Sequence, residues 1–276
     1  MAMSLAELRA KHQKMLEEKD NQKSEGGSDF VTFDQGSNVI RFLPGKEDPF
    51  EFFSESVVHK YVDEEGKHRK YRCRKPAGEK CPVCELFWDL WKMHKELNLP
   101  KGQKSKYGDL ATKIKQKSLF YAVAVSRKLQ EAGENPVKIA AMGKQLFDVV
   151  MGELVNPENL ADDSNGDPDE DSHMLSLDKG LDFDVIVTKN GEFNNFQTSK
   201  AKRKHTKAGS PLEVAEWMEH QIDLSKFSEV DSYEDGKKIV DNLLASLSTS
   251  KVDSVTTSKE DSDDDGEEKF NQDLKV

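Results

Sequence analysis

The positions of the three cysteines constrain the fold of this chain more than any other feature of its sequence. Cys81 and Cys84 form a Cys-Pro-Val-Cys knuckle, and Cys73 lies eight residues before it. His59 stands fourteen residues before Cys73, so a short stretch supplies three thiolates and one imidazole. This is the donor set of a closed tetrahedral Cys3His zinc site. Because a closed site has no position for water, the sequence predicts one structural zinc ion in a lobe spanning about residues 59–97.

Two other histidines and one class of enzyme are alternatives to this interpretation. His68 lies at the tip of a predicted hairpin among cations, where a neutral ligand is less favoured, and His94 lies on the helix that the knuckle opens. His94-Lys95-Glu96 is an H-x-E sequence, which zinc deaminases combine with P-C-x-x-C. Here the order is reversed and Lys80 stands where that proline would be. Since the sequence also lacks phosphate-loop, dinucleotide and hydrolase signatures, we expect no enzyme.

Charge is unevenly distributed along the chain. The formal net charge is −11, but residues 153–171 carry eight acids and no base, and residues 260–268 carry seven acids in nine positions. Cations gather instead at 67–75, 101–117 and 200–207. Such clusters can neutralise phosphates and release counterions, although each alone is equally typical of a solvated loop.

Short apolar stretches predict a mainly β protein with several helices. Strands are expected at 30–33, 38–44, 52–62, 69–73, 119–125 and 183–187, and helices at 84–97, 142–154, 212–222 and 237–247. Short strands separated by polar turns are typical of a small barrel or sandwich. The hairpin of 52–62 and 69–73 would place Cys73 roughly opposite His59.

The two ends of the chain are expected to lie outside the folded core. Residues 1–22 predict a short basic helix with Ser4 as its N-cap, too short to be stable alone in water. Residues 246–276 contain too few apolar side chains to form a core, so a disordered acidic tail is predicted there. This tail would either keep the chain soluble or compete with nucleic acid for the basic groove and recruit partners. The predicted core is 23–245. The sequence shows no signal peptide or membrane span, and clustered cysteines predict a reducing cytosol.

Aromatic residues accompany the basic clusters. Tyr71 lies within 67–75 and Tyr107 within 101–117, and Phe120-Tyr121 follows the second of these runs. Three phenylalanines, Phe183, Phe193 and Phe196, precede 200–207. Stacking on a ring contributes ~1–3 kcal/mol per base and tolerates any sequence, while cations follow the phosphate backbone. For each ring alone, packing in a core is the better explanation. In an alternating strand only one of Phe120 and Tyr121 can face a ligand.

Several of these motifs together resemble a known family. They are the stretch Val39–Lys46 followed by Pro49-Phe50, the ligand set His59, Cys73, Cys81 and Cys84, the basic-then-aromatic stretch Lys115–Val125, and Gly143–Phe147. In this combination the chain resembles the gene 32 single-stranded DNA-binding proteins of T-even-type bacteriophages, which have tryptophan where this chain has Phe147. The similarity covers roughly residues 30–230.

The resemblance implies an OB-fold core with a zinc subdomain that coats single-stranded DNA in phage replication, recombination and repair. It implies cooperative head-to-tail self-association through the arm, here through Ser4, Arg9, Lys11 and Lys14. The acidic tail would bind replication and recombination proteins such as DNA polymerase and a helicase loader, in the cytoplasm of an infected bacterium. Met1-Ala2-Met3 stands where the family has a basic triplet, so the arm departs from the family pattern.

The residues and the resemblance together give an expected set of DNA contacts. The phosphate contacts are Arg41, Arg69, Lys70, Arg72, Arg74, Lys115 and Lys117, and the stacking rings are Tyr71, Tyr107, Phe120, Tyr121, Phe147, Phe183 and Phe196. Two alternatives remain open at this point. One is a zinc-ribbon adaptor that binds proteins, and the other is an RNA-binding protein, because stacking and phosphate contacts do not distinguish the sugars.

Overall fold

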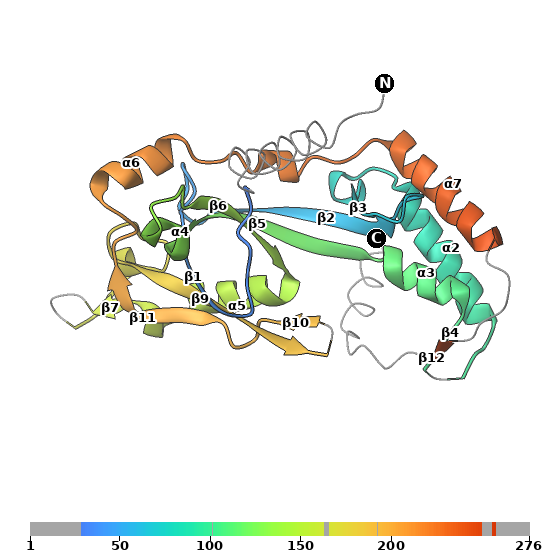
Figure 1. Ribbon diagram of the computed structural model, residues 1–276, viewed down its shortest axis with the longest axis horizontal. Helices are drawn as coiled ribbons and strands as arrows, with labels where there is room; N and C mark the ends of the chain where they lie inside the picture. Colours follow the sequence, from blue (N-terminus) through green and yellow to red (C-terminus); the bar gives the residue numbers. More distant parts are fainter. Residues whose placement is uncertain (1–28, 101, 163–165, 192, 250–255, 258–276) are drawn as a thin grey trace, which may run out of the picture. The chain divides into compact units, whose positions relative to one another are not determined.

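The computed structural model describes residues 29–100, 102–162, 166–191, 193–249 and 256–257 (Figure 1). The chain divides into two compact units. The first, which we call the sheet unit, contains the described parts of Met1–Ser56 and Ser118–Ser228. The second, the cysteine unit, contains those of Val57–Lys117 and Glu229–Val276. The predicted arm of residues 1–22 lies outside the described residues, as does most of the predicted tail.

The sheet unit is built on antiparallel strands, as the mainly β prediction requires. Their order is β10-β9-β1-β5-β2, while β6 pairs with β5 and β11 pairs with β9. The bounds are β1 Gly36–Phe42, β2 Phe53–Val62, β5 Gln116–Ser126, β6 Val137–Gly143, β9 Gly180–Asn190, β10 Phe193–Asn195 and β11 Lys200–Thr206. Both β2 and β5 contribute residues to both units.

Alternation along these strands produces an apolar cluster on each face of the sheet. On one face Phe42, Phe120 and Phe183 pack with Leu146 from helix α5 (Lys144–Leu154). On the other face Val123 packs with residues that include Leu43, Val125, Ala208 and Trp217, the last of these from α6 (Pro211–Glu219). A capping box between Ser210 and Glu213 begins α6. The mainly β fold with helices is therefore confirmed, and the OB topology stays a prediction.

Short elements complete the sheet unit. They are α4 Arg127–Glu131, η2 Pro157–Asn159, β7 Ala161–Asp162, β8 Pro168–Asp169, η3 Glu170–Ser172 and η4 Ser225–Phe227. The strand predicted at 30–33 is wrong, because only Phe30 makes an isolated bridge, to Ile139. The Val31 amide also donates to the Ile139 carbonyl, but residues 31–34 have no regular pairing.

The cysteine unit combines a hairpin with three helices. The hairpin is β2 with β3 (His68–Arg72), and the helices are α2 Pro82–Glu96, α3 Lys106–Ile114 and α7 Tyr233–Thr249. Gly66 supplies the positive φ of 77° that the hairpin turn needs. The remaining elements are η1 Lys75–Ala77, β4 Gln103–Lys104 and β12 Thr256–Thr257.

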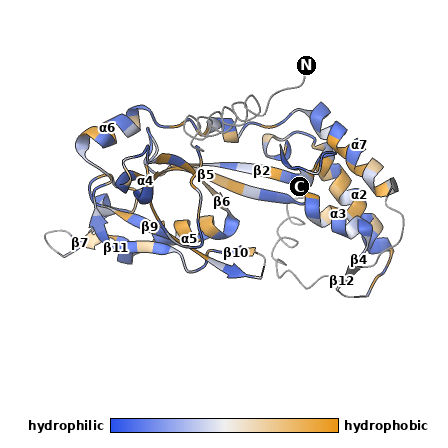
Figure 2. Cartoon of the chain, in the orientation of Figure 1, coloured by the Kyte–Doolittle hydropathy of each residue, from blue (hydrophilic) through white to orange (hydrophobic). Residues whose placement is uncertain are grey.

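The helices of the cysteine unit are amphipathic. Figure 2 shows hydrophobic and hydrophilic residues together on α2 and α7. Leu90 of α2 and Leu243 of α7 are buried in one apolar cluster with Tyr71 and Ile114. Helix α7 ends at Thr249, three residues after the predicted start of the tail at Ser246. In the described part of the chain, no helix has the length and apolar character that a membrane span requires.

Candidate metal centre and nucleic-acid interface

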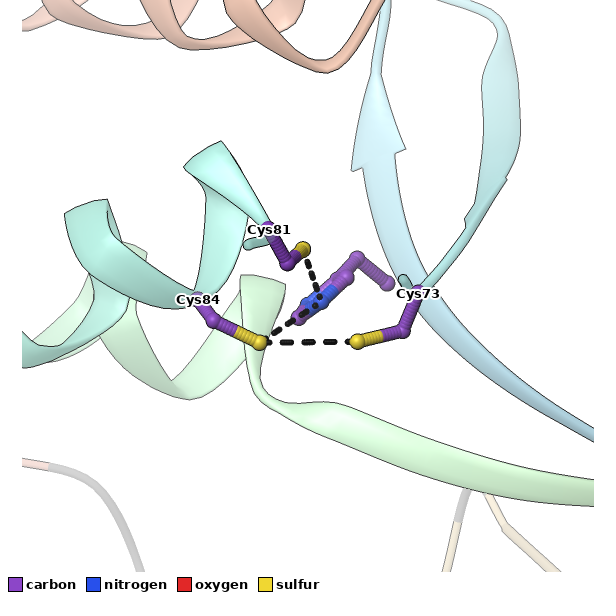
Figure 3. A group of neighbouring side chains, drawn as sticks. Cys73, Cys81 and Cys84 are labelled. Carbon is purple, nitrogen blue, oxygen red and sulfur yellow. Dashed lines mark hydrogen bonds between the residues drawn. The ribbon is translucent and has the colours of Figure 1, made fainter. Parts of the chain in front are cut away.

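The four predicted zinc ligands come together in the cysteine unit. His59, Cys73, Cys81 and Cys84 are buried, and their donor atoms all lie within 4.8 Å of one another. The Cys73 and Cys84 sulfurs are 3.5 Å apart, and His59 Nε2 lies 3.4 Å from the Cys84 sulfur and 3.5 Å from that of Cys81 (Figure 3). Zinc–ligand bonds of usual length give tetrahedron edges of about 3.5–3.8 Å, so these donors fit a tetrahedral metal ion.

Local structure explains why these side chains meet. Cys81 is the N-cap of α2 and Cys84 lies in its first turn, so the two sulfurs lie on one side of the helix end. His59 pairs with Tyr71, and the Cys73 amide donates to the Val57 carbonyl at 2.7 Å. The expected register, with Cys73 opposite His59, is therefore wrong by two residues. Side chains in a strand alternate between two faces, so a register shift of two residues keeps Cys73 on the same face of the hairpin as His59.

Two residues that the sequence did not indicate orient the donors. His59 Nδ1 donates to the Ile114 carbonyl at 2.6 Å, which leaves Nε2 facing the thiols. Gln116 Nε2 donates to the sulfurs of Cys73 and Cys84 at 2.9 and 3.2 Å. Ile114 ends α3 and Gln116 begins β5, so the junction of these two elements forms an outer layer around the site.

The electrostatics of the cluster favour a bound cation. Burial lowers the pKa of His59, but hydrogen bonds to Cys73 and Cys81 and to the Ile114 carbonyl outweigh it, and the pKa rises to about 9. Hydrogen bonds with Cys73 and Cys84 lower the pKa of Cys81, whereas those with Cys73 and Cys81 raise the pKa of Cys84. Three buried thiolates repel one another, so a metal ion is what allows all of them to ionise together. The residues present therefore fit a metal ion.

The rival histidines lie elsewhere in the described structure. His68 is exposed at the start of β3, and His94 Nδ1 lies 2.9 Å from the Ser105 hydroxyl. Neither belongs to the cluster of potential ligands.

The arginines expected to contact phosphate in this unit all have acidic partners. Arg69 binds Asp63 at 2.8 Å on one face of the hairpin, and Arg72 binds Asp231 at 2.8 Å on the other. Arg74 donates to the Asp231 carbonyl at 2.6 Å and also pairs with Glu79. These contacts give the arginines a structural role in the hairpin.

The lysines of the same region are different. Lys60 and Lys70 are directly opposite each other in β2 and β3, both are exposed, and both point away from the metal ligands. Lys117 also faces away from the cluster, because its neighbour Gln116 points toward the sulfurs. Although Lys60 is exposed, the surrounding protein partly removes it from water, and this desolvation lowers its pKa. The charges of Lys117 and Lys70 lower the pKa further. We call Lys60, Lys70 and Lys117 the lysine face.

None of these three lysines takes part in an ion pair within the part of the chain that the structure describes. Lys115, just before β5, is likewise exposed. Lys60 was missed at the sequence level because it interrupts an apolar strand and belongs to no basic run. Its position opposite Lys70 becomes visible only with the register of the hairpin.

Arg41 occupies the interior of the sheet unit. Its side chain is 0% exposed, it donates to the Thr206 carbonyl, and it lies 3.6 Å from Asp182. Burial lowers its pKa to about 10, partly offset by the charge of Asp182. Because a buried guanidinium cannot reach a phosphate in this conformation, we do not propose Arg41 as a DNA contact.

Four of the expected stacking rings are largely covered. Phe183 and Tyr71 are 0% and 1% exposed, so neither ring can stack on a base in this conformation. We therefore do not propose either ring as a DNA contact. Phe120 stacks on Phe147 with ring centroids 3.7 Å apart, and Tyr121 stacks on Phe227 at 4.1 Å. Phe120 and Tyr121 indeed face opposite sides of β5, but other rings already cover both.

The remaining expected rings are partly exposed. Tyr107 on α3 is half-buried, with the Lys106 ammonium 5.4 Å from its ring centroid. Phe147 and Phe196 are half-buried at the edge of the sheet-unit core. Phe193, which accompanied the 200–207 run in the sequence, is 67% exposed on β10. The expected self-association residues Ser4, Arg9, Lys11 and Lys14 lie outside the described residues.

Comparison with known proteins assigns the chain to a family. The family model described as gp32 DNA binding protein like matches residues 34–262, which include the sheet strands and all four potential metal ligands. A search of curated proteins found no match. The matched family is one of DNA-binding proteins, not of enzymes. The chain therefore belongs to the gp32-like DNA-binding protein family, which supports a role in DNA binding.

Proposed function

We propose that the protein binds single-stranded DNA without regard to sequence. The observation that carries this proposal is the lysine face, which consists of three cations on β2, β3 and β5 that make no ion pair within the described residues. Lysine ammonium groups are point charges that attract phosphates, and contacts to phosphate carry no sequence information. The partly exposed rings Tyr107, Phe147 and Phe196 would add stacking, which every base can satisfy.

We propose that the bound metal is zinc and that its role is structural. His59, Cys73, Cys81 and Cys84 would hold it, because three thiolates and an imidazole suit zinc better than harder cations. Bound there, the ion supplies the positive charge that holds the thiolates together and attaches the start of α2 to the hairpin. Lys60 and Lys70 lie on that hairpin, so their position depends on the same cluster.

The wider role rests on family membership and on the sequence resemblance. We propose that the protein coats DNA cooperatively during phage replication, recombination and repair, in the cytoplasm of an infected bacterium. Residues 1–22 would mediate self-association, and residues 246–276 would bind replication and recombination proteins such as DNA polymerase and a helicase loader. The folded core between these segments would hold the DNA.

A fluorescence titration with a dT oligonucleotide tests the proposed function directly. Trp88 and Trp91 on α2 lie close to Cys84 in sequence and provide the signal. We expect tight binding at 50 mM salt, with the logarithm of affinity falling by about 0.7 per phosphate contact for each tenfold rise in salt. Chelation of the metal should weaken binding. No binding at low salt would contradict the proposal, and equal binding to duplex DNA would contradict its single-strand specificity.

A further inference from the structure

Strand β11 presents an unusual concentration of positive charge at an edge of the sheet unit (Figure 1). Lys200, Lys202, Arg203 and Lys204 are all exposed, while Ala201 is buried. Among the described strands β11 pairs with β9 alone, so no strand covers its other edge, where the Ala201 amide donates to the Glu153 carboxylate at 3.3 Å. The run was visible in the sequence, but nothing derived so far accounts for it.

The pairing of β11 with β9 is interrupted where the cations lie. Ala201 is opposite Phe183 and His205 is opposite Leu181, so Lys202, Arg203 and Lys204 together face the single residue Asp182. Two extra residues are thus accommodated in a bulge. A bulge interrupts the hydrogen-bond ladder and turns its side chains out of the regular alternation, which is why bulges often lie beside functional sites.

The residue opposite the bulge cannot neutralise it. The Asp182 carboxylate is bound by Arg127 at 2.7 Å and lies 3.6 Å from the Arg41 guanidinium. Within the described residues, Lys202, Arg203 and Lys204 take part in no ion pair. By contrast, nearby Lys179 binds Asp169 at 2.7 Å. The bulge therefore carries three adjacent charges without a partner.

Protection of the sheet edge does not by itself explain this arrangement. Natural proteins discourage edge-to-edge pairing with a charged side chain or a bulge at the edge. One lysine within a bulge would serve that purpose, whereas β11 places three cations in succession. Like charges held side by side also repel, so the arrangement has a cost that an anionic ligand would remove.

We propose that the bulge Lys202–Lys204 is a second site for the DNA backbone, distinct from the lysine face of the cysteine unit. This inference rests on the proposed function. The site consists of three exposed, adjacent charges, which suits a repeating phosphate chain better than the mixed side chains of an acidic peptide. Strands β10 and β11 both pair with the side of β9 opposite β1, so Phe193 of β10 lies along the same side of β9 as the bulge. Its exposed ring could stack on a base.

The test is the salt dependence of binding to a dT oligonucleotide by the full-length triple variant K202Q/R203Q/K204Q. Removing three phosphate contacts should reduce the slope of log affinity against log salt by about 2. Between 50 and 200 mM salt, the wild type should then lose roughly 20-fold more affinity than the variant does. Because the three side chains are exposed and repel one another, the variant should melt at the wild-type temperature or slightly above it.

The matched control is K128Q/K144Q/K179Q, which removes the same charge from the sheet unit. These lysines already bind Asp34, Asp148 and Asp169, so the slope should stay close to that of the wild type. Equal slopes for the wild type and the bulge variant would overturn the inference while leaving the proposed function intact. Failure of the wild type to bind at low salt would instead reject the proposed function.

A second arm of the experiment distinguishes DNA from the chain's own acidic segment. A synthetic peptide of residues 258–270 is titrated against the wild type and the bulge variant. Peptide binding that is lost in the bulge variant, together with unchanged DNA binding, would assign the bulge to the acidic segment and overturn the inference. Loss of DNA affinity without peptide binding supports it.

Discussion

The two compact units are stabilised by different means. The sheet unit buries large apolar side chains on both faces of its strands, among them Phe42, Phe52 and Phe183. The cysteine unit has a smaller apolar cluster that surrounds three thiols and an imidazole. Burial of apolar surface stabilises the first unit directly. Bringing three thiolates together in a buried site costs free energy unless a cation compensates, so we expect the second unit to depend on the proposed metal ion.

The two units also share one pattern in their cations. In the sheet unit Arg41 and Arg127 lie against Asp182, and in the cysteine unit Arg69 and Arg72 bind Asp63 and Asp231. The planar guanidinium suits such fixed pairs, whereas lysine is a flexible point charge. Within the described residues, the proposed phosphate contacts of both units make no ion pair, and all of them except Arg203 are lysines.

The largest expected effect is that of metal removal on the cysteine unit. A structural zinc ion contributes an apparent ~10–16 kcal/mol in small domains, so stripping it should unfold the region around β3 and α2. We expect hydrogen exchange to become fast there and to stay slow in β1 and β9 of the sheet unit. Equal loss of protection in both units, or no loss in either, would contradict the difference between them.

The complementary change is Phe183→Ala in the sheet unit. Deleting this fully buried ring should cost about 3–5 kcal/mol through lost burial and the cavity left behind. Urea denaturation followed by hydrogen exchange should show the loss in β9, whereas zinc affinity should remain that of the wild type. A weakened zinc affinity would mean that the two kinds of stabilisation are not separate.

A smaller effect is expected from Gln116→Ala in the outer layer of the metal site. The amide that donates to Cys73 and Cys84 would be lost, and such changes weaken metal binding by roughly 10–100-fold. Competition with a chromophoric chelator measures this directly. The exposed Gln197→Ala is the control and should bind zinc like the wild type. Equal affinities in the two variants would remove Gln116 from the site.

The smallest expected effect is that of Lys60→Gln on stability. Removing one charge from the Lys60–Lys70 pair should stabilise the free protein by about 0.2–1 kcal/mol, at the lower end because solvent screens exposed charges. The same change should weaken DNA binding and lower the salt slope by about 0.7. Thermal melts and oligonucleotide titrations check the two effects. A variant that loses stability would show that Lys60 has a structural partner.

This stabilisation should also depend on pH. The folded-state pKa of Lys60 lies below its ordinary value of 10.5, so near that pH the folded protein binds fewer protons than the unfolded one. Wild-type stability should therefore rise as pH increases through the folded-state pKa. The advantage of the variant should be present at neutral pH and vanish as pH approaches 10.5. An advantage that persisted above that pH would not be electrostatic.

Local sequence was sufficient to predict that the four potential metal ligands lie close together. Cys81 and Cys84 lie on one helix turn, and His59 and Cys73 lie on one hairpin, so spacing alone brings them near each other. The mainly β class also followed from short apolar stretches. The register was harder, because a shift of two residues leaves the same side chains on the same face and changes nothing that a sequence pattern can detect.

The DNA-contact residues were harder to predict because charge and exposure do not reveal a partner. Arg69, Arg72 and Arg74 looked like phosphate ligands, but their acidic partners Asp63, Asp231 and Glu79 become evident only in the folded chain. Phe183 lies near a basic run in sequence, yet alternation turns it into the core. Long-range pairing decides such cases, as it does for Lys60.

The most direct test of a DNA contact on each of the two units is hydrogen exchange of the zinc-loaded protein with and without a dT oligonucleotide. We expect DNA to slow exchange in β2 and β3, beside the lysine face, and in β11, with little change in α5. Protection confined to one of these regions would restrict the contact to that unit. Saturated binding with no protection in either region would contradict the assignment of both.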